Sequence, residues 1–406
     1  MKRQVRSLSI ILAVCFTATA GAATLEGFAS LPADTLMPGP DSGHFIEADE
    51  NLDLPFKGQP AQGFSAIVAD SGGGYLALSD NGYGTRENSS DFLLRIYFLS
   101  PDFRTLGGGS GTIEIEGFIN LSDPLRLMPY PITAERQCLG SPDPCIPVDP
   151  SVRAERLLTG ADLDTESLQV SSDGSFWIGD EFGPYLLHFD PQGVLIEAPF
   201  ELQGLVSDTR PGALPATRTL RPSRGFENLA LSPSGELLYP MLEGALYSQP
   251  EHLNIYTFDV ENRRYLNPSA TEPSFRYRMD PLATAVGAFK MTGEDTALVL
   301  ERDSGQGEDA KHKKLYRVTF TAPDDQGYLA RTEWVDLLNI DDPHDLNQDD
   351  SNHFSLPMST LEGVIVTDDG LVGIISDNNY PFGKARGEEH APEATEFVLL
   401  RRAQQP

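Results

Sequence analysis

Basic residues are scarce in this sequence, which has 30 Lys and Arg against 60 Asp and Glu and a formal net charge of −30. So acidic a surface repels nucleic acids and anionic membranes, and we expect neither as a partner. Long helical periodicity is missing, and so are the GxSxG, HExxH, GxGxxG and P-loop motifs. These absences remove the common serine-hydrolase, zinc-peptidase and nucleotide-binding signatures.

Long apolar runs are also missing, because no stretch approaches the roughly 18 apolar residues that a membrane-spanning helix needs. The longest, Leu8–Ala18, follows the basic residues Lys2, Arg3 and Arg6 and precedes the small residues Ala20–Ala22. This order is typical of a cleaved signal peptide over residues 1–22. We therefore expect a mature chain from Ala23 that is periplasmic or secreted. Removing three basic residues and no acidic one changes its charge to −33.

Cysteine is rare as well, with three residues in the whole sequence. Cys15 lies in the leader, so Cys138 and Cys145 are the two that remain after cleavage. Two close cysteines in an exported chain usually form a disulfide, which we expect here.

Internal repetition is the strongest positive signal. Similar segments, each with an alternating apolar strand, a turn with Gly and a second strand, begin at Gly63, Asp164, Gly225 and Leu361, and a weaker copy contains Gly293. Each copy predicts a β-hairpin. Further strand-like runs between the hairpins begin at Phe92, Tyr185, Leu253, Lys314 and Glu396.

This pattern predicts an all-β protein, a β-propeller of five to seven blades in a single domain over residues 23–406, with six blades favoured. Proline-rich insertions near residues 120–160 and 206–224 interrupt the repeats. Loops of this kind often build the binding site of a propeller.

Acidic residues recur at equivalent places in the hairpins. Glu166, Glu227 and Glu362 each stand eight residues before the turn Gly, where the first hairpin has Ser65. If these hairpins are the inner strands, the three glutamates form a ring around the central axis. The acidic residues that end the second strands would flank this ring: Asp80, Asp180, Glu181, Glu243, Glu301 and Asp377.

Crowded carboxylates need a counter-charge, and Ca²⁺ accepts six to eight oxygen ligands. We expect a Ca²⁺ site whose ligands are Asp80, Glu166, Asp180, Glu227, Glu362 and Asp377, with Asn81 and Asn378 close by. The alternative is that each acidic residue caps a turn. An EF-hand at residues 344–353 is excluded, because Asp350 stands where that loop requires Gly.

The few basic residues near the acidic strand ends are candidate ligands for an oxyanion. They are Arg224, Arg302, Lys311, Lys313 and Lys314. The lysines could instead protect an edge strand from aggregation.

The segments around "GDEFGP" and "LERD", together with the hairpins from Gly63 to Leu400, resemble the phytase-like family, named for an esterase-like activity of phytase. The resemblance implies an exported phosphoester hydrolase related to calcium-dependent propeller phytases. Ser65 departs from the Glu of the other units, which leaves Asp80 as the acidic residue of that blade.

We therefore expect a monomeric, metal-dependent hydrolase of small phosphate esters. Glu181 or Glu301 would act as general base, while Arg224, Arg302, Lys313, Lys314 and Asn378 would bind the substrate. Two alternatives remain: a metal-dependent lactonase or carboxylesterase, and a non-catalytic binding protein with structural Ca²⁺.

Overall fold

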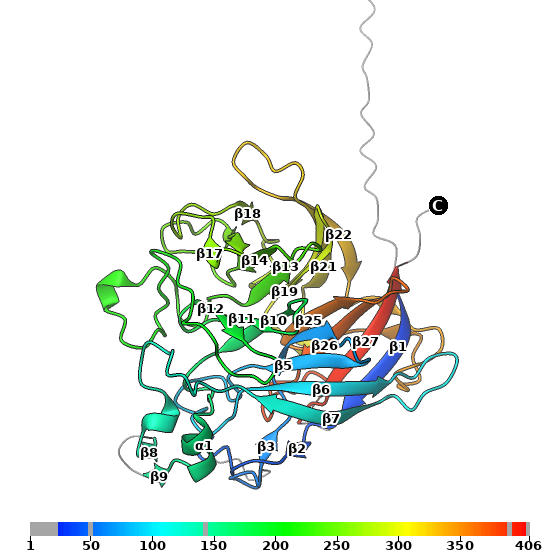
Figure 1. The fold of residues 1–406 in the computed structure, drawn as a ribbon. Helices are drawn as coiled ribbons and strands as arrows, with labels where there is room; N and C mark the ends of the chain where they lie inside the picture. The colour runs from blue at the N-terminus through cyan, green and yellow to red at the C-terminus, as the bar shows by residue number, and fades with distance from the viewer. Residues whose placement is uncertain (1–22, 48–51, 141–144, 388–391, 403–406) are drawn as a thin grey trace, which may run out of the picture.

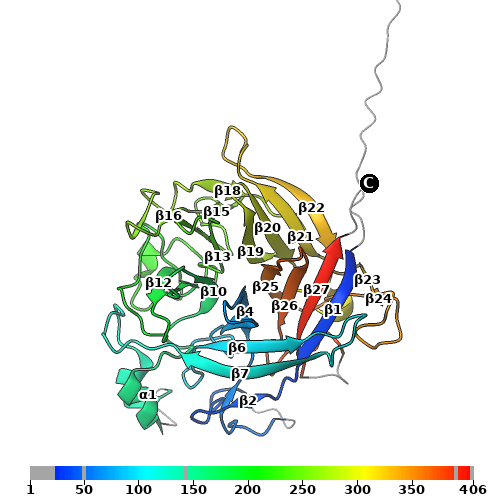
Figure 2. The same cartoon turned by 45° about the vertical axis from the view of Figure 1, so that its right-hand side comes forward.

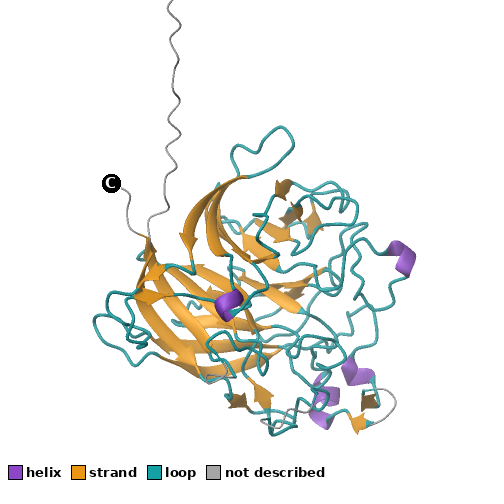
Figure 3. Cartoon of the chain, turned by 180° about the vertical axis from the view of Figure 1, so that it is seen from behind, coloured by secondary structure: helices purple, strands orange, loops and turns teal. Residues whose placement is uncertain are grey.

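The computed structural model describes residues 23–47, 52–140, 145–387 and 392–402, and the signal peptide expected over residues 1–22 lies outside this range. The described chain is almost entirely β-structure and loops (Figure 3). Its helices are α1 (Pro150–Glu155) and the 3-10 turns Thr133–Glu135, Pro215–Thr217 and Gly307–Asp309. None of the helices in the described part is long and apolar enough to cross a membrane.

The strands form five antiparallel units, each led by an inner strand. The first contains β4 (Phe64–Ala69), β5 (Tyr75–Ser79), β6 (Arg95–Asp102) and β7 (Thr112–Asn120). The second contains β10 (Thr165–Val170), β11 (Phe176–Asp180) and β12 (Tyr185–Phe189). The fourth contains β19 (Ala285–Gly293), β20 (Thr296–Arg302), β21 (Lys313–Thr319) and β22 (Ala330–Asp336).

The third unit contains β13 (Asn228–Leu231), β14 (Leu237–Met241), β15 (Leu253–Ile255), β16 (Phe258–Asp259), β17 (Arg264–Tyr265) and β18 (Phe275–Tyr277). The fifth contains β25 (Thr360–Val366), β26 (Val372–Asp377), β27 (Thr395–Arg402) and β1 (Ala23–Leu31). Three short pairs complete the list: β2 (Leu36–Met37) with β3 (Gln59–Pro60), β8 (Cys138–Leu139) with β9 (Ile146–Pro147), and β23 (Ile340–Asp341) with β24 (His353–Phe354).

The inner strands close a ring. β4 contacts β10, and the contacts continue through β13, β19 and β25 back to β4. Figure 2 shows these five strands around one axis. The fold is thus a β-propeller, as predicted, and its described strands give five blades. This count lies within the predicted range of five to seven, and the favoured number of six is one more than the described strands form.

The last blade combines both ends of the described chain. β1 pairs antiparallel with β27 from Ala23↔Arg402 to Leu31↔Thr395, and the two strands lie side by side in Figure 1. β1 also touches β7 of the first blade at Ser30↔Thr112. The ring is therefore closed by hydrogen bonds between strands that are far apart in sequence.

The turns of the hairpins use glycine as the sequence predicts. Gly174 and Gly370 have φ values of +83° and +82°, which residues other than Gly rarely adopt. Apolar side chains of neighbouring blades, such as Leu78 with Leu168 and Trp177 with Phe258, fill the space between the sheets.

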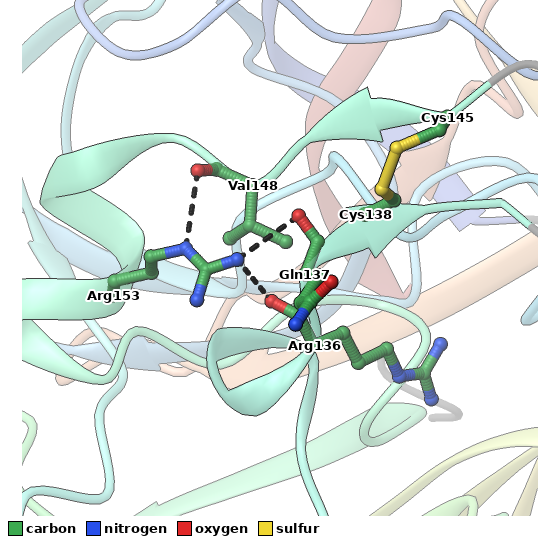
Figure 4. The surroundings of a disulfide bond; sticks show 6 residues. All are labelled: Arg136, Gln137, Cys138, Cys145, Val148 and Arg153. Atoms are coloured by element: carbon green, nitrogen blue, oxygen red, sulfur yellow. Dashed lines mark hydrogen bonds between the residues drawn. A yellow bond between two sulfur atoms is a disulfide. The ribbon is translucent and has the colours of Figure 1, made fainter.

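The first insertion connects β7 to β10. Cys138 and Cys145 form the expected disulfide across its small hairpin. Figure 4 shows Arg153 donating hydrogen bonds to the backbone carbonyls of Val148, Gln137 and Arg136, which ties α1 to this hairpin.

Candidate functional site: an axial carboxylate cluster

In four of the five inner strands a β-bulge leaves one residue near the start of the strand out of the pairing. The register skips Ser65 in β4, Glu166 in β10, Gly287 in β19 and Glu362 in β25. Glu227 holds the equivalent place directly before β13. A bulged residue is left out of the strand pairing and its side chain is re-aimed.

These side chains meet at one end of the central channel. Glu166, Glu227 and Glu362 each offer an oxygen, and the three oxygens lie within 4.8 Å of one another. The Ser65 hydroxyl donates a hydrogen bond to Glu362 Oε2 at 3.2 Å. A cavity of about 30 Å³ lies beside them and is lined by all five inner strands. The structure thus brings the three glutamates together from three blades.

A second ring comes from the ends of the second strands. In four blades the residue directly before the bulge pairs with Ser79, Asp180, Glu301 or Ser376. The residue that follows each of these four therefore occupies an equivalent position in its blade. The members of this second ring are Asp80, Glu181, Glu243, Arg302 and Asp377. Four blades thus contribute a carboxylate and one contributes a guanidinium.

Asp164 completes the cluster, and the sequence interpretation gave it no role. Its carboxylate lies within 4.8 Å of oxygens of Glu166 and Glu181. A third such group contains Glu181, Glu227 and Glu243. Asp164 stands two residues before Glu166, in the most acidic stretch of the hairpins. This position is the feature of the sequence that could have indicated its membership of the cluster.

Two of the expected acidic site residues lie outside the cluster. Asp180 Oδ1 accepts from the Asp164 amide at 2.9 Å, and Asp180 Oδ2 accepts from the Gly183 amide at 2.6 Å. Asp180 therefore shapes the β11–β12 turn. Neighbouring strand residues face opposite sides, and Glu181, one residue further, is the one that reaches the cluster.

Glu301 is the second of these. Its carboxylate accepts hydrogen bonds from the Tyr277 hydroxyl at 2.7 Å, the Asp280 amide at 2.9 Å and Arg331 Nη1 at 2.8 Å. His312 Nε2 lies 3.2 Å from the same group. These partners surround both oxygens of the carboxylate. Glu301 is therefore not positioned to take a proton from a substrate or water, the role expected of it.

Arg302 takes the place that a fifth acidic residue would have. A Cβ at Gly287 would lie 3.4 Å from Arg302 Nε and 2.1 Å from the Leu361 carbonyl oxygen. Arg302 Nη2 lies 3.0 Å from Glu362, 3.2 Å from Glu243 and 3.7 Å from Glu227. Arg302 is thus an internal counter-ion of the cluster.

Burial and mutual repulsion disfavour the ionised carboxylates. Burial, followed by the charge of Asp164, raises the pKa of Glu166 well above its usual value. Burial also raises the pKa of Glu227 to about 7, although Arg302 opposes the shift. The pKa values of Asp80, Glu181 and Glu362 are raised well above normal, with burial the largest cause in each. The cluster therefore needs positive charge beyond that of Arg302 to be fully ionised.

The donor set fits a hard divalent cation. Asp164 Oδ1, Glu181 Oε1 and Glu227 Oε1 are buried and have no hydrogen-bond partner. Buried carboxylate oxygens rarely remain unsatisfied without a bound ion or water. Arg302 and Arg224 contact the side that contains Glu227, Glu243 and Glu362. Asp164, Glu166 and Glu181, by contrast, form no ion pair with any described residue, so they are the best place for a cation.

The expected lysines do not line the cluster. Lys313 is fully buried, and its Nζ lies 2.8 Å from Asp303 Oδ1 and donates to the Asp303 carbonyl at 2.7 Å. Lys314 Nζ lies 2.8 Å from Glu333. Asn378 donates to the Glu393 carbonyl at 3.0 Å, and its buried Oδ1 has no partner. The two lysines therefore stabilise the fourth blade.

A pocket of about 410 Å³ opens next to the second ring. Glu243 belongs to both, and Arg224 pairs with Glu243 at their junction. The loops after β14 and β18 supply most of the walls. Arg221, His252 and Arg278 also line it, and the sequence interpretation did not single them out, because only the folded loops bring them together.

The fold and site thus define a five-bladed β-propeller with a buried acidic cluster on its axis. The chain belongs to the phytase-like family, described as esterase-like activity of phytase, whose model matches residues 59–380. The resemblance seen in the sequence is therefore confirmed.

A curated relative is an uncharacterized secreted protein of Arthroderma benhamiae, 25% identical over 193 residues. The match spans 38% of this chain and 37% of that relative. That relative is described as secreted, and this chain contains a disulfide.

Similar solved structures include a Trichoderma reesei carbohydrate-active enzyme of family AA12 in its calcium form, 12% identical with a TM-score of 0.32. That match covers 96% of this chain and 100% of the other. Another is virginiamycin B lyase from Staphylococcus aureus, 11% identical with a TM-score of 0.30, covering 85% of this chain and 71% of the other. Likenesses this low carry no argument about activity.

Proposed function

We propose that the protein is an exported, metal-dependent hydrolase of small phosphate esters that acts at the axial cluster. The observation that carries the proposal is the set of buried, unpartnered oxygens of Asp164, Glu181 and Glu227 beside a pocket with an arginine at its edge. Membership of the phytase-like family supports the same class of reaction.

Asp164, Glu166 and Glu181 would hold the cation, and Ca²⁺ is the first choice because all donors are oxygens. When bound, such an ion polarises a phosphoryl oxygen and lowers the pKa of a coordinated water. Asp80 and Asp377 lie in the second ring with Glu181 and add negative charge that favours a cation.

Glu227 would accept a proton at Oε1, which accepts no hydrogen bond, because this carboxylate borders the cation group without belonging to it. Arg302, 3.7 Å from Glu227, would hold this carboxylate in position. Arg224 lines the pocket where it meets the axial cluster, and its guanidinium would bind the phosphate oxygens.

The test measures bound metal and turnover on the same purified chain. The substrates are 4-nitrophenyl phosphate, bis(4-nitrophenyl) phosphate, 4-nitrophenyl acetate and a γ-lactone, each with Ca²⁺ or with a chelator. We expect phosphoester turnover that the chelator abolishes and Ca²⁺ restores. Turnover of only the acetate or the lactone would overturn the phosphate assignment. Bound metal without turnover of any substrate would indicate a binding protein.

A further inference from the structure

The pocket beside the cluster is rich in arginine. The chain has twice as many acidic as basic residues, yet Arg221, Arg224 and Arg278 all line this one pocket, together with His252. Three acidic residues, Glu243, Glu251 and Asp280, line it as well. The pocket therefore favours an anionic ligand only where its arginines have no carboxylate partner.

Two of the three acidic residues of the pocket are paired with an arginine, and the third, Glu251, is exposed and forms no ion pair with a described residue. Glu243 is paired with Arg224 and with Arg302. Asp280 Oδ2 lies 3.9 Å from Arg331 Nη2, outside the lining of the pocket. Arg221 and Arg278, in contrast, form no ion pair with any carboxylate in the described part of the chain. Both side chains are exposed and free to bind an anion.

Arg278 is held in place by an aromatic ring. Its guanidinium lies 4.1 Å from the centre of the Tyr328 ring. The Tyr328 hydroxyl in turn lies 3.2 Å from His252 Nδ1. A stacked guanidinium is already ordered before it binds, so less conformational entropy is lost when a carboxylate or phosphate arrives.

Apolar side chains form part of the remaining wall and give the pocket room for an organic group. Leu246, Pro250, Tyr277 and Met279 line it. Its volume of about 410 Å³ lies within the range of small-molecule sites. Arg224 lines the pocket next to the axial cluster, and Arg221 and Arg278 supply further positive charge.

We infer that this pocket selects esters whose leaving group carries a second anionic group, bound by Arg278 and Arg221 while the reacting phosphate lies at Arg224. The inference rests on the proposed function for the position of the reacting phosphate. It goes further in naming the substrate class: an organic phosphate with a compact apolar body and a second carboxylate or phosphate.

The kinetic test compares phenyl phosphate, 4-carboxyphenyl phosphate and 4-carbamoylphenyl phosphate, the last being the neutral counterpart of the carboxylate. We expect kcat/KM for the carboxylate to exceed that for the amide by about tenfold, mostly through KM. Arg278→Gln, or the double variant with Arg221→Gln, should bring this ratio close to one. Arg317→Gln, an exposed arginine on β21, is the matched control and should keep the ratio.

A binding experiment separates this inference from the proposed function. Calorimetry measures the affinity of 4-carboxybenzylphosphonate and of benzylphosphonate for the full chain with Ca²⁺. An affinity difference that Arg278→Gln removes would support the inference even if no ester is hydrolysed. Equal affinities, or equal kcat/KM for carboxylate and amide substrates, would overturn it while leaving the proposed hydrolysis intact.

Discussion

Arg302 lies over Gly287, so that one blade presents a guanidinium where the others present carboxylates. The two residues are linked sterically, because a side chain at position 287 would press on Arg302 and on the backbone of the next blade. Through this pair the fourth blade neutralises one half of the cluster and leaves the other half, at Asp164, without an ion pair among the described residues.

The close approach at Gly287 makes the first prediction. Gly287→Ala places a Cβ 2.1 Å from the Leu361 carbonyl oxygen, so the two inner strands must separate. We expect a loss of about 2 kcal/mol in the free energy of unfolding, measured by urea denaturation. Gly107→Ala is the control, because Gly107 lies in an exposed loop and a Cβ there would be 3.5 Å from its nearest neighbour, Thr105 Oγ1. This variant should change stability little. Equal effects of the two variants would contradict the strand contact.

Removal of the internal counter-ion is the second prediction. Arg302→Met leaves Glu227, Glu243 and Glu362 without their shared partner. We expect a loss of about 3–5 kcal/mol in chelator, since unpaired buried charges are costly, and partial recovery on adding Ca²⁺. Thermal unfolding with and without the ion measures this, with Arg317→Met as control. A loss that Ca²⁺ leaves unchanged would show that the cation does not share this electrostatic cluster.

Two neighbouring aspartates should respond in opposite ways. Asp162 accepts four hydrogen bonds from the amides and hydroxyls of Thr133 and Thr159. Asp162→Asn should therefore lower stability by about 1–3 kcal/mol and leave Ca²⁺ affinity unchanged. Asp164→Asn should weaken Ca²⁺ binding by at least about tenfold and preserve the metal-free fold, because it removes a crowded charge. Calorimetric titration together with unfolding curves distinguishes the two, and a reversal of these effects would move the metal site.

The buried Glu393 predicts a pH dependence away from the cluster. Burial raises its pKa from 4.5 to about 7, and its Oε2 accepts from the Ala385 amide at 3.1 Å. Below pH 4.5 the group is protonated in both states. Between pH 4.5 and about 7 the carboxyl ionises in the unfolded state but stays protonated in the folded state. The free energy of unfolding therefore falls over this interval, by up to about 3 kcal/mol.

Glu393→Gln removes this dependence. The variant should gain stability over the wild type at pH 8 and match it near pH 4, as measured by denaturant unfolding at several pH values. Glu155→Gln, at an exposed position, is the control. A constant difference between wild type and Glu393→Gln at every pH would be evidence against a neutral buried carboxyl.

The sequence was sufficient to predict the propeller and the meeting of three glutamates, because each hairpin repeats the same spacing between Glu and turn Gly. It could not show that Glu181, rather than Asp180, reaches the axis. A bulge shifts the pairing by one residue and so reverses which side chain faces inward. Only coordinates fix that register.

The hairpin of the fourth blade gives a weaker pattern in the sequence. Gly287 carries no side chain to mark its equivalence with Glu166, so the sequence indicates Arg302 as a substrate ligand and not as a member of the ring. The pocket with Arg221 and Arg278 is built by loops between blades, and loops have no periodicity from which their neighbours can be predicted.

The pairing of β1 with β27 also bears on how the chain folds. The residues that seal the ring are separated by almost the whole described sequence, which gives this topology a high contact order and a slow closing step. Blades can form early from local hairpins, but the axial glutamates acquire their final spacing only when the first strand docks beside the last. Assembly of the acidic centre is therefore a late event, and any ligand that requires all blades in place will stabilise only the fully closed protein.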